Sequence, residues 1–142
     1  MKFFIGLMCL GYSFLTCAAP MGVDINISNA WVRAAPPAVK MMAGYLTIAN
    51  HSSKDLKLTS ISSDVFGFVE VHRSYLEDGF MKMAHVGELV IKKGDKVILE
   101  PASYHLMLMA KKKPLKIGDL VKMTLYFDDS MEKTVIFEVR KQ

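Results

Sequence analysis

Histidine and methionine alternate in the segment Tyr104–Pro114, which reads YHLMLMAKKKP. His105, Met107 and Met109 stand at every second position, so in a β-strand they would point to one face while the intervening leucines point to the other. A buried strand needs no histidine, and a strand face in water rarely carries two methionines. We therefore interpret this face as a candidate binding surface.

A second stripe of histidine and methionine surrounds the Asp78-Gly79 pair, a dipeptide that tolerates the positive φ angles of a two-residue hairpin turn. With these residues in the turn, Glu77 pairs with Phe80. Counting outwards, His72 then pairs with His85. One face of the hairpin would carry four possible metal ligands: His72, Met81, Met83 and His85. The two stripes can form one site only if the fold brings both segments together, and the sequence alone leaves this open.

Imidazole nitrogen and thioether sulfur, without a carboxylate, form a soft ligand set. Ca²⁺ and Mg²⁺ prefer oxygen ligands, and Zn²⁺ prefers thiolate, imidazole and carboxylate to thioether. Thioethers favour Cu(I), whereas two imidazoles could also bind Cu(II). Because methionine binds a metal without losing a proton, only the histidines would make the affinity fall at low pH. The residue types therefore predict a copper site, with Cu(I) as the expected ion and Cu(II) as an alternative.

None of the catalytic arrangements that we sought is present in the sequence. It has no glycine-rich phosphate loop and no nucleophile elbow, and nothing orders a serine with a histidine and an acid into a triad. The acidic residues near the two stripes are assigned to solvated strand edges and turns: Glu70, Glu77, Asp78 and Glu88. A formal net charge of +4, from 18 basic and 14 acidic residues, is too small to indicate nucleic-acid binding. We expect a binding protein, not an enzyme.

Residues 1–19 have the features of a secretory signal peptide: a basic start, the apolar run Phe3–Leu15 and small residues at the cleavage region. The run is shorter than the roughly 20 residues that span a bilayer, and no second apolar span follows. We therefore expect a mature protein, residues 20–142, without a transmembrane segment. Both cysteines lie in the leader, so the mature protein would enter an oxidising compartment without thiols. A lipid anchor at Cys17 is the less favoured alternative, because Thr16 is a poor residue before a lipidated cysteine.

Alternating apolar and polar residues, interrupted by turn residues, predict an all-β fold. Five segments show the alternation best: Ala43–Asn50, Leu56–Ser62, Phe66–Arg73, Leu120–Phe127 and Thr134–Val139. Met123 lies on the apolar face of one of them and is expected in the core. Eight or nine short strands in about 120 residues favour a single domain built as a sandwich or a small barrel.

The spacing of four residues resembles the copper-binding pattern of the periplasmic PCu(A)C copper chaperones: His72, ten residues, Met83, twenty-one residues, His105, one residue, Met107. The resemblance extends to sequence blocks that occur in the same order in that family: AWVRAAPP, AGYLTIAN, YHLMLMAKKKPLKIGD and VKMTLYF. Together they cover roughly residues 29–128, nearly the whole mature domain. A match of this extent is more specific than a single H-x-M would be.

This resemblance implies a cupredoxin-like Greek-key β-sandwich that holds Cu(I) with four ligands: His72, Met83, His105 and Met107. It further implies transfer of the copper to a cuproprotein, in the best-known role the CuA centre of cytochrome c oxidase, or to another copper chaperone. Many family members have methionine directly after the first histidine, where this chain has Arg73. His85 is not part of the family pattern. Met81 and Met109 are expected to form a rim or to act as reserve donors.

Two other functions remain compatible with the sequence. A metal-free periplasmic interaction module of the immunoglobulin-like type would take up no copper and would not depend on the His/Met residues. A copper storage or detoxification protein would bind copper without delivering it. An electron-transfer cupredoxin would need a cysteine ligand, which the mature chain lacks.

Overall fold

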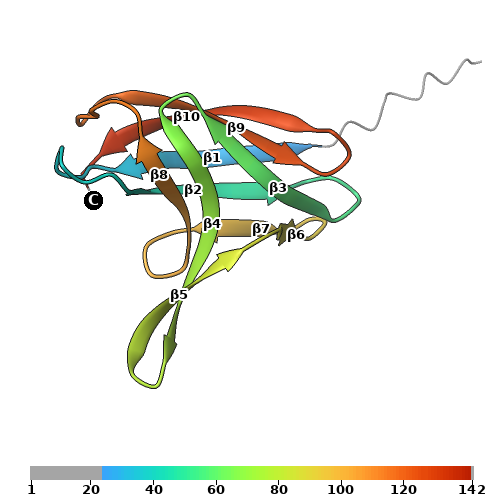
Figure 1. Ribbon diagram of the computed structural model, residues 1–142. Helices are drawn as coiled ribbons and strands as arrows, with labels where there is room; N and C mark the ends of the chain where they lie inside the picture. Colours follow the sequence, from blue (N-terminus) through green and yellow to red (C-terminus); the bar gives the residue numbers. More distant parts are fainter. Residues whose placement is uncertain (1–23, 142) are drawn as a thin grey trace, which may run out of the picture.

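Ten β-strands form the regular structure in residues 24–141, the range that the computed structural model describes (Figure 1). They are β1 (Ile25–Arg33), β2 (Met42–Asn50), β3 (Leu56–Ser63), β4 (Phe66–Glu77), β5 (Phe80–Val86), β6 (Leu89–Ile91), β7 (Lys96–Leu99), β8 (Tyr104–Lys111), β9 (Leu120–Phe127) and β10 (Glu132–Arg140). The predicted signal peptide, residues 1–19 with Cys17, lies outside the described residues. Residues 24–141 include no helix that could cross a membrane.

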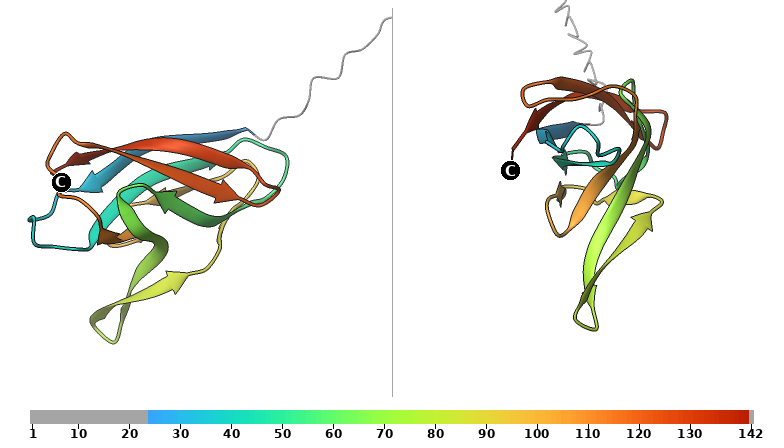
Figure 2. Two further views of the ribbon diagram at one scale, coloured as in Figure 1. Left: turned by 45° about the horizontal axis from the view of Figure 1, so that its top comes forward. Right: turned by 60° about the vertical axis from the view of Figure 1, so that its left-hand side comes forward.

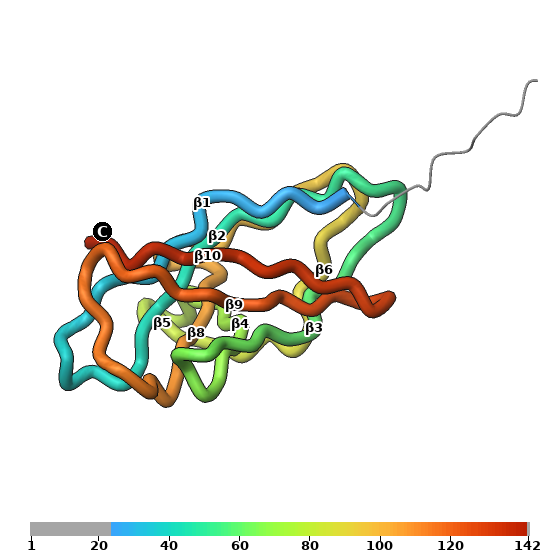
Figure 3. Tube along the Cα trace, turned by 90° about the horizontal axis from the view of Figure 1, so that it is seen from above, coloured from blue at the N-terminus to red at the C-terminus, as the bar shows by residue number. Residues whose placement is uncertain are grey.

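Nine of the strands follow one hydrogen-bonded path, in the order β5-β4-β8-β2-β1-β10-β9-β3-β6, and β7 pairs with β2 beside this path. The pairing of β1 with β10 is parallel, and the other pairings are antiparallel. The path curls over on itself, so its inner faces enclose the core (Figure 2). Seen from above, β1, β10 and β9 run side by side over that core (Figure 3). The prediction of an all-β fold is confirmed.

The core takes one face of each alternating segment. In β8, Leu106 and Leu108 are completely buried, and in β9 Met123 is 1% exposed, as predicted for a core residue. Burial of a large apolar side chain contributes about 1.5–3 kcal/mol relative to leaving it in water. Because the leucines fix β8 with one face inward, His105 and the methionines beyond it must lie on the other face.

The hairpin of β4 and β5 projects from the body of the molecule (Figures 1 and 2). Its register is the predicted one, with Glu77 paired to Phe80 and His72 paired to His85. The two residues of the Asp78-Gly79 turn have φ angles of 52° and 78°, the positive values that the turn requires. β4 pairs with β5 along one edge and with β8 along the other, so it is the middle strand of three.

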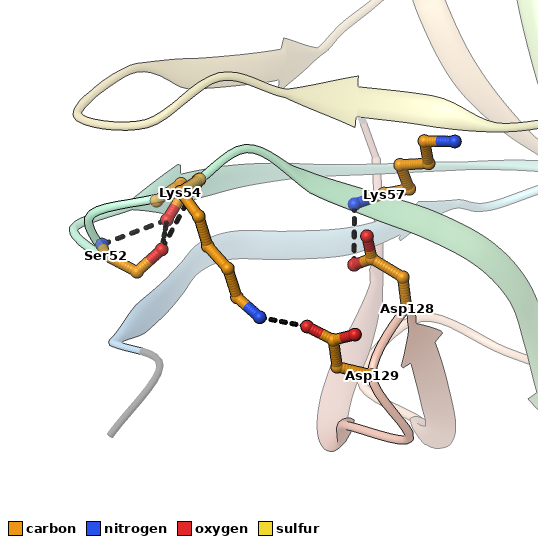
Figure 4. A network of polar contacts seen from close by, with 6 residues as sticks. Ser52, Lys54, Lys57, Asp128 and Asp129 are labelled. Atoms are coloured by element: carbon orange, nitrogen blue, oxygen red, sulfur yellow. Dashed lines mark hydrogen bonds and ion pairs between the residues drawn. The ribbon is translucent and has the colours of Figure 1, made fainter. Parts of the chain in front are cut away.

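Polar contacts close the opposite end of the strands, between the β2–β3 and β9–β10 loops (Figure 4). Lys54 forms an ion pair with Asp129, and this hydrogen bond raises the pKa of Lys54. Asn50 is completely buried and donates to the carbonyl oxygen of Lys54 at 2.8 Å and to that of Ile91 at 3.0 Å. Asn50 and Met42 are the two ends of β2, about 26 Å apart at roughly 3.3 Å per residue. These contacts therefore lie far from the His/Met stripes.

Candidate metal centre

Three histidines form a row across β5, β4 and β8. His72 on β4 pairs with His85 on one side and with His105 on the other. The ring centroids of His72 and His85 are 5.5 Å apart, and those of His72 and His105 are 6.1 Å apart. Residues that are directly paired in a sheet point to the same face. The fold thus brings the two His/Met stripes together, which the sequence alone left open.

Met83 and Met107 lie on either side of this row. Met107 pairs with Glu70, and Met83 pairs with Ser74. A cavity of about 240 Å³ is lined by Met83, Met107 and His105. Its remaining wall comes from the end of β1, the loop that follows and the start of β2: Arg33, Ala34, Ala35, Met41, Met42 and Ala43. Three of the four predicted ligands therefore share one cavity.

The fourth predicted ligand, His72, lies beside this cavity and not in its wall. Its ring is next to that of His105, and its side chain is 14% exposed. An ion between the two rings could therefore be bound by both histidines, one from β4 and one from β8.

His105 forms the buried end of the centre and is 7% exposed. Its Nδ1 lies 3.1 Å from the carbonyl oxygen of Ser103. A carbonyl oxygen can only accept, so Nδ1–H donates, and Nε2 of the neutral ring keeps its lone pair. The same carbonyl oxygen accepts the backbone N–H of Ser74 at 3.0 Å, which ties it to β4. His105 is held with one nitrogen free to bind a metal.

Glu70 orients the other histidine. Its Oε2 lies 2.9 Å from Nε2 of His72, and because a carboxylate accepts, Nε2–H donates. The neutral ring of His72 then offers its Nδ1 lone pair. A carboxylate that accepts from a metal-binding histidine fixes the ring and strengthens the ligand. Glu70 is thus part of the centre and not simply a solvated edge residue.

The other three acidic residues of that group do lie at strand edges and turns, with Asp78 in the hairpin turn. Glu77 pairs with Lys82 within the hairpin, and Glu88 pairs with Lys57 at 3.1 Å. The signal that separates Glu70 from them is its spacing. It stands two positions before His72 on the same strand, so the two side chains share a face.

Exposure of the donors decreases from the hairpin towards β8. Met83 is 52% exposed, Met107 is partly buried, and His105 is buried. The centre is therefore open to solvent on the β5 side and closed on the β8 side. An incoming ion or a partner's ligand would meet Met83 first.

The remaining methionines of the two stripes lie one pair farther out. Met81 pairs with Leu76, and Met109 pairs with Phe68. Neither lines the cavity that contains the predicted ligands. Their positions suit the rim expected from the sequence.

Met41 is an additional sulfur that the alternation patterns do not reveal. It stands just before β2, is 57% exposed and lines the same cavity as Met83 and Met107. Its neighbour Met42 is 5% exposed and belongs to the core. The path of the β1–β2 loop places Met41 in the cavity wall. The residue patterns of the hairpin and of β8 carry no information about that path.

Nitrogen and oxygen donors alone do not form a metal position with the side chains as they stand. Within residues 24–141, no three histidine, cysteine, aspartate or glutamate side chains converge on one point. With the side chains in these positions, the thioethers must therefore complete a site at the histidine row. That requirement favours an ion that accepts sulfur ligands.

Comparison with known proteins places the chain in a family. Residues 25–139 match the LpqE-like family model. The uncharacterized protein RP573 of Rickettsia prowazekii is 35% identical over 127 residues, which cover 84% of this chain and 68% of that protein. The solution structure of CuI-DR1885 from Deinococcus radiodurans is 30% identical, with a TM-score of 0.63, and the match covers 89% of this chain and 83% of that one.

The fold is shared with PCuAC domains. The copper-bound PCuAC domain from PmoF2 superimposes with a TM-score of 0.72 at 21% identity, over 85% of this chain and 97% of that domain. The predicted cupredoxin-like architecture is thereby confirmed. The chain belongs to the LpqE-like family and has the PCuAC fold, which confirms the recognition made from its His/Met spacing.

Proposed function

We propose that this protein is a periplasmic copper chaperone that binds Cu(I) and transfers it to a cuproprotein. The proposed ligands are those of the family pattern: His72, Met83, His105 and Met107. The observation that carries the proposal is the pairing of His72 with His105, with ring centroids 6.1 Å apart, beside a cavity lined by three of the four ligands. The relative DR1885, whose Cu(I) form has been solved, supports copper as the cargo.

The donor set suits Cu(I) on chemical grounds. Two neutral imidazoles and two thioethers match the soft, monovalent ion, whereas hard divalent ions would lack oxygen ligands. Both histidines already have one N–H engaged, with Ser103 and with Glu70, so the other nitrogen is free to bind. No ligand is a thiol, so disulfide formation in an oxidising compartment would not destroy the site.

The gradient of exposure supports transfer by stepwise ligand exchange. Met83, at the open side, would be displaced first by a thiolate or imidazole of the acceptor. His105, at the buried end, would be released last. Copper would then stay bound to one protein or the other throughout the transfer.

The proposed acceptor rests on the family resemblance. The proposed location rests on the predicted signal peptide. The CuA centre of cytochrome c oxidase is the proposed acceptor, with another copper chaperone as the alternative. Export by the predicted signal peptide, residues 1–19, would place the protein in the periplasm, and a lipid anchor at Cys17 is the less favoured variant. Storage or detoxification would use the same copper site without an acceptor.

X-ray absorption at the copper edge of the Cu(I)-loaded protein tests this ligand set. We expect copper–sulfur scattering near about 2.3 Å together with the multiple scattering of imidazole rings. A shell of nitrogen and oxygen alone would contradict the proposed ligands. Failure to take up copper at all would favour the metal-free interaction module.

Replacement of Glu70 by alanine should lower the Cu(I) affinity by about 10- to 100-fold, because His72 loses the carboxylate that orients it. The affinity is measured by competition with a Cu(I) chelator. Glu77→Ala is the matched control, because Glu77 is on the same strand but pairs with Lys82 at the surface. Equal affinities for the two variants would show that Glu70 does not act on the centre.

A further inference from the structure

The third histidine of the row, His85, is not part of the family pattern, yet it is as near to His72 as His105 is. The His72 and His85 rings lie 5.5 Å apart at an interplanar angle of 65°. The two residues are directly paired across β4 and β5, and His85 is exposed. An exposed imidazole on the outer strand can change its side-chain torsion without disturbing the core.

Two of the nitrogen and oxygen donors near the row line a second hollow, distinct from the methionine-lined cavity. This second hollow has a volume of about 190 Å³ and is lined by residues 58–61 of β3, residues 69–71 of β4 and residues 85–87 at the end of β5. His85 and Glu70 line this hollow, whereas Met83, Met107 and His105 line the other. His72 stands between them, because it contacts Glu70 and is paired with both other histidines. His72 thus neighbours both a sulfur-rich set of donors and a nitrogen and oxygen set.

The contact between His72 and Glu70 has the spacing of two ligands of one divalent ion. Nε2 of His72 and Oε2 of Glu70 are 2.9 Å apart. Bonds of about 2.0–2.1 Å from an ion to an imidazole nitrogen and to a carboxylate oxygen, at a right angle, place those two atoms about 2.9 Å apart. An ion could therefore take the place of the proton that Nε2 donates to Glu70, if the neutral ring changes tautomer and carries that proton on Nδ1 instead.

We propose that His72, His85 and Glu70 form a second position that binds Cu(II), next to the position proposed for Cu(I). Imidazole nitrogen and carboxylate oxygen in a tetragonal arrangement suit Cu(II), and water completes its shell. As the side chains stand, these donors do not converge. Binding therefore requires the exposed His85 ring to turn towards His72.

The two positions exclude each other, because a neutral imidazole has a single lone pair to donate. In the tautomer whose Nε2–H is bonded to Glu70, the lone pair of His72 is on Nδ1 and is available to the sulfur-rich position. In the other tautomer the proton is on Nδ1, and the lone pair on Nε2 is available to the second position. The protein would therefore hold one copper ion at a time, as Cu(I) in the sulfur-rich position or as Cu(II) in the second position. The inference rests on the proposed copper-binding function.

The variant His85→Gln tests the second position, with His51→Gln as its matched control. His51 is an exposed histidine just after β2, at the opposite end of that strand from the centre. Each protein is loaded with one equivalent of Cu(II) for electron paramagnetic resonance, and its Cu(II) and Cu(I) affinities are measured against competing chelators. We expect His85→Gln to weaken Cu(II) binding by at least about tenfold, and far more than Cu(I) binding, because one of three Cu(II) ligands is removed.

The spectra give a second readout. Cu(II) in the unmodified protein and in His51→Gln should show coupling to two imidazoles, and in His85→Gln to one. Identical spectra and Cu(II) affinities in all three proteins would overturn the inference. If the unmodified protein failed to bind Cu(I), the proposed function itself would fall. If Cu(I) bound with sulfur ligands and only the effect of His85→Gln were missing, the proposed function would stand without the second position.

Discussion

Replacement of both Met83 and Met107 by leucine should lower the Cu(I) affinity by at least about a hundredfold. Each lost thioether needs to contribute only about 1.4 kcal/mol, a factor of about ten in affinity, for the double variant to reach this value. Leucine keeps the size and apolar character of methionine, and such exchanges usually cost less than about 1.5 kcal/mol of stability. Met83 is 52% exposed, so little packing is at risk there. Chelator competition measures the affinity, and circular dichroism verifies that the fold is intact.

The chain offers a control of the same chemistry. Met81 and Met109 lie on the same faces as Met83 and Met107 but one pair farther from the histidine row. The double variant Met81→Leu/Met109→Leu removes the same number of sulfurs from the same two strands and should change the affinity by less than about twofold. If both double variants bound Cu(I) as the unmodified protein does, the thioethers would not be ligands and the proposed centre would be ruled out.

The hairpin half of the centre could be predicted from local chemistry. An Asp-Gly pair between alternating segments fixes a two-residue turn, and the turn fixes every pairing outward from it. The predicted pairs Glu77–Phe80 and His72–His85 are both present in the structure. Turn type and strand alternation are local properties, so they can be read without knowledge of the rest of the fold.

The pairing of β4 with β8 could not be predicted in this way. His72 and His105 are separated by β5, β6 and β7, and which strands become neighbours depends on how all the apolar faces are buried together. Only the resemblance to a known family supplied that expectation. The short strands β6 and β7, of 3 and 4 residues, are also too brief for alternation to reveal, which explains why ten strands were found where eight or nine were expected.

The missed members of the centre differ in how they could have been found. Glu70 was within reach of sequence reasoning, because a spacing of two on a strand places it beside His72. Its carboxylate was assigned to solvent because acidic residues on strand edges usually are solvated. Met41 was out of reach, since its place in the cavity wall depends on the path of the β1–β2 loop.

Cu(I) loading should raise the free energy of unfolding by about 4 kcal/mol when free Cu(I) is held at roughly a thousand times its dissociation constant. The ligands come from three strands, so only the folded chain assembles them. β5 pairs only with β4, and most of its side chains are exposed, so a metal that ties Met83 to β8 should stabilise this edge most. Urea unfolding with and without chelator-buffered Cu(I) measures the gain, and hydrogen exchange of the β5 amides locates it.

The leucine variant of Met83 and Met107 supplies the control for this stabilisation. It has the same strands and nearly the same packing, so nonspecific effects of copper on the chain would shift its unfolding as much as that of the unmodified protein. The specific stabilisation, in contrast, should fall to about 1.4 kcal/mol, because a hundredfold weaker affinity removes about 2.7 kcal/mol of the gain at the same free Cu(I). An equal shift in both proteins would mean that copper binds elsewhere. Stabilisation without added protection of β5 would mean that β5 contributes no ligand.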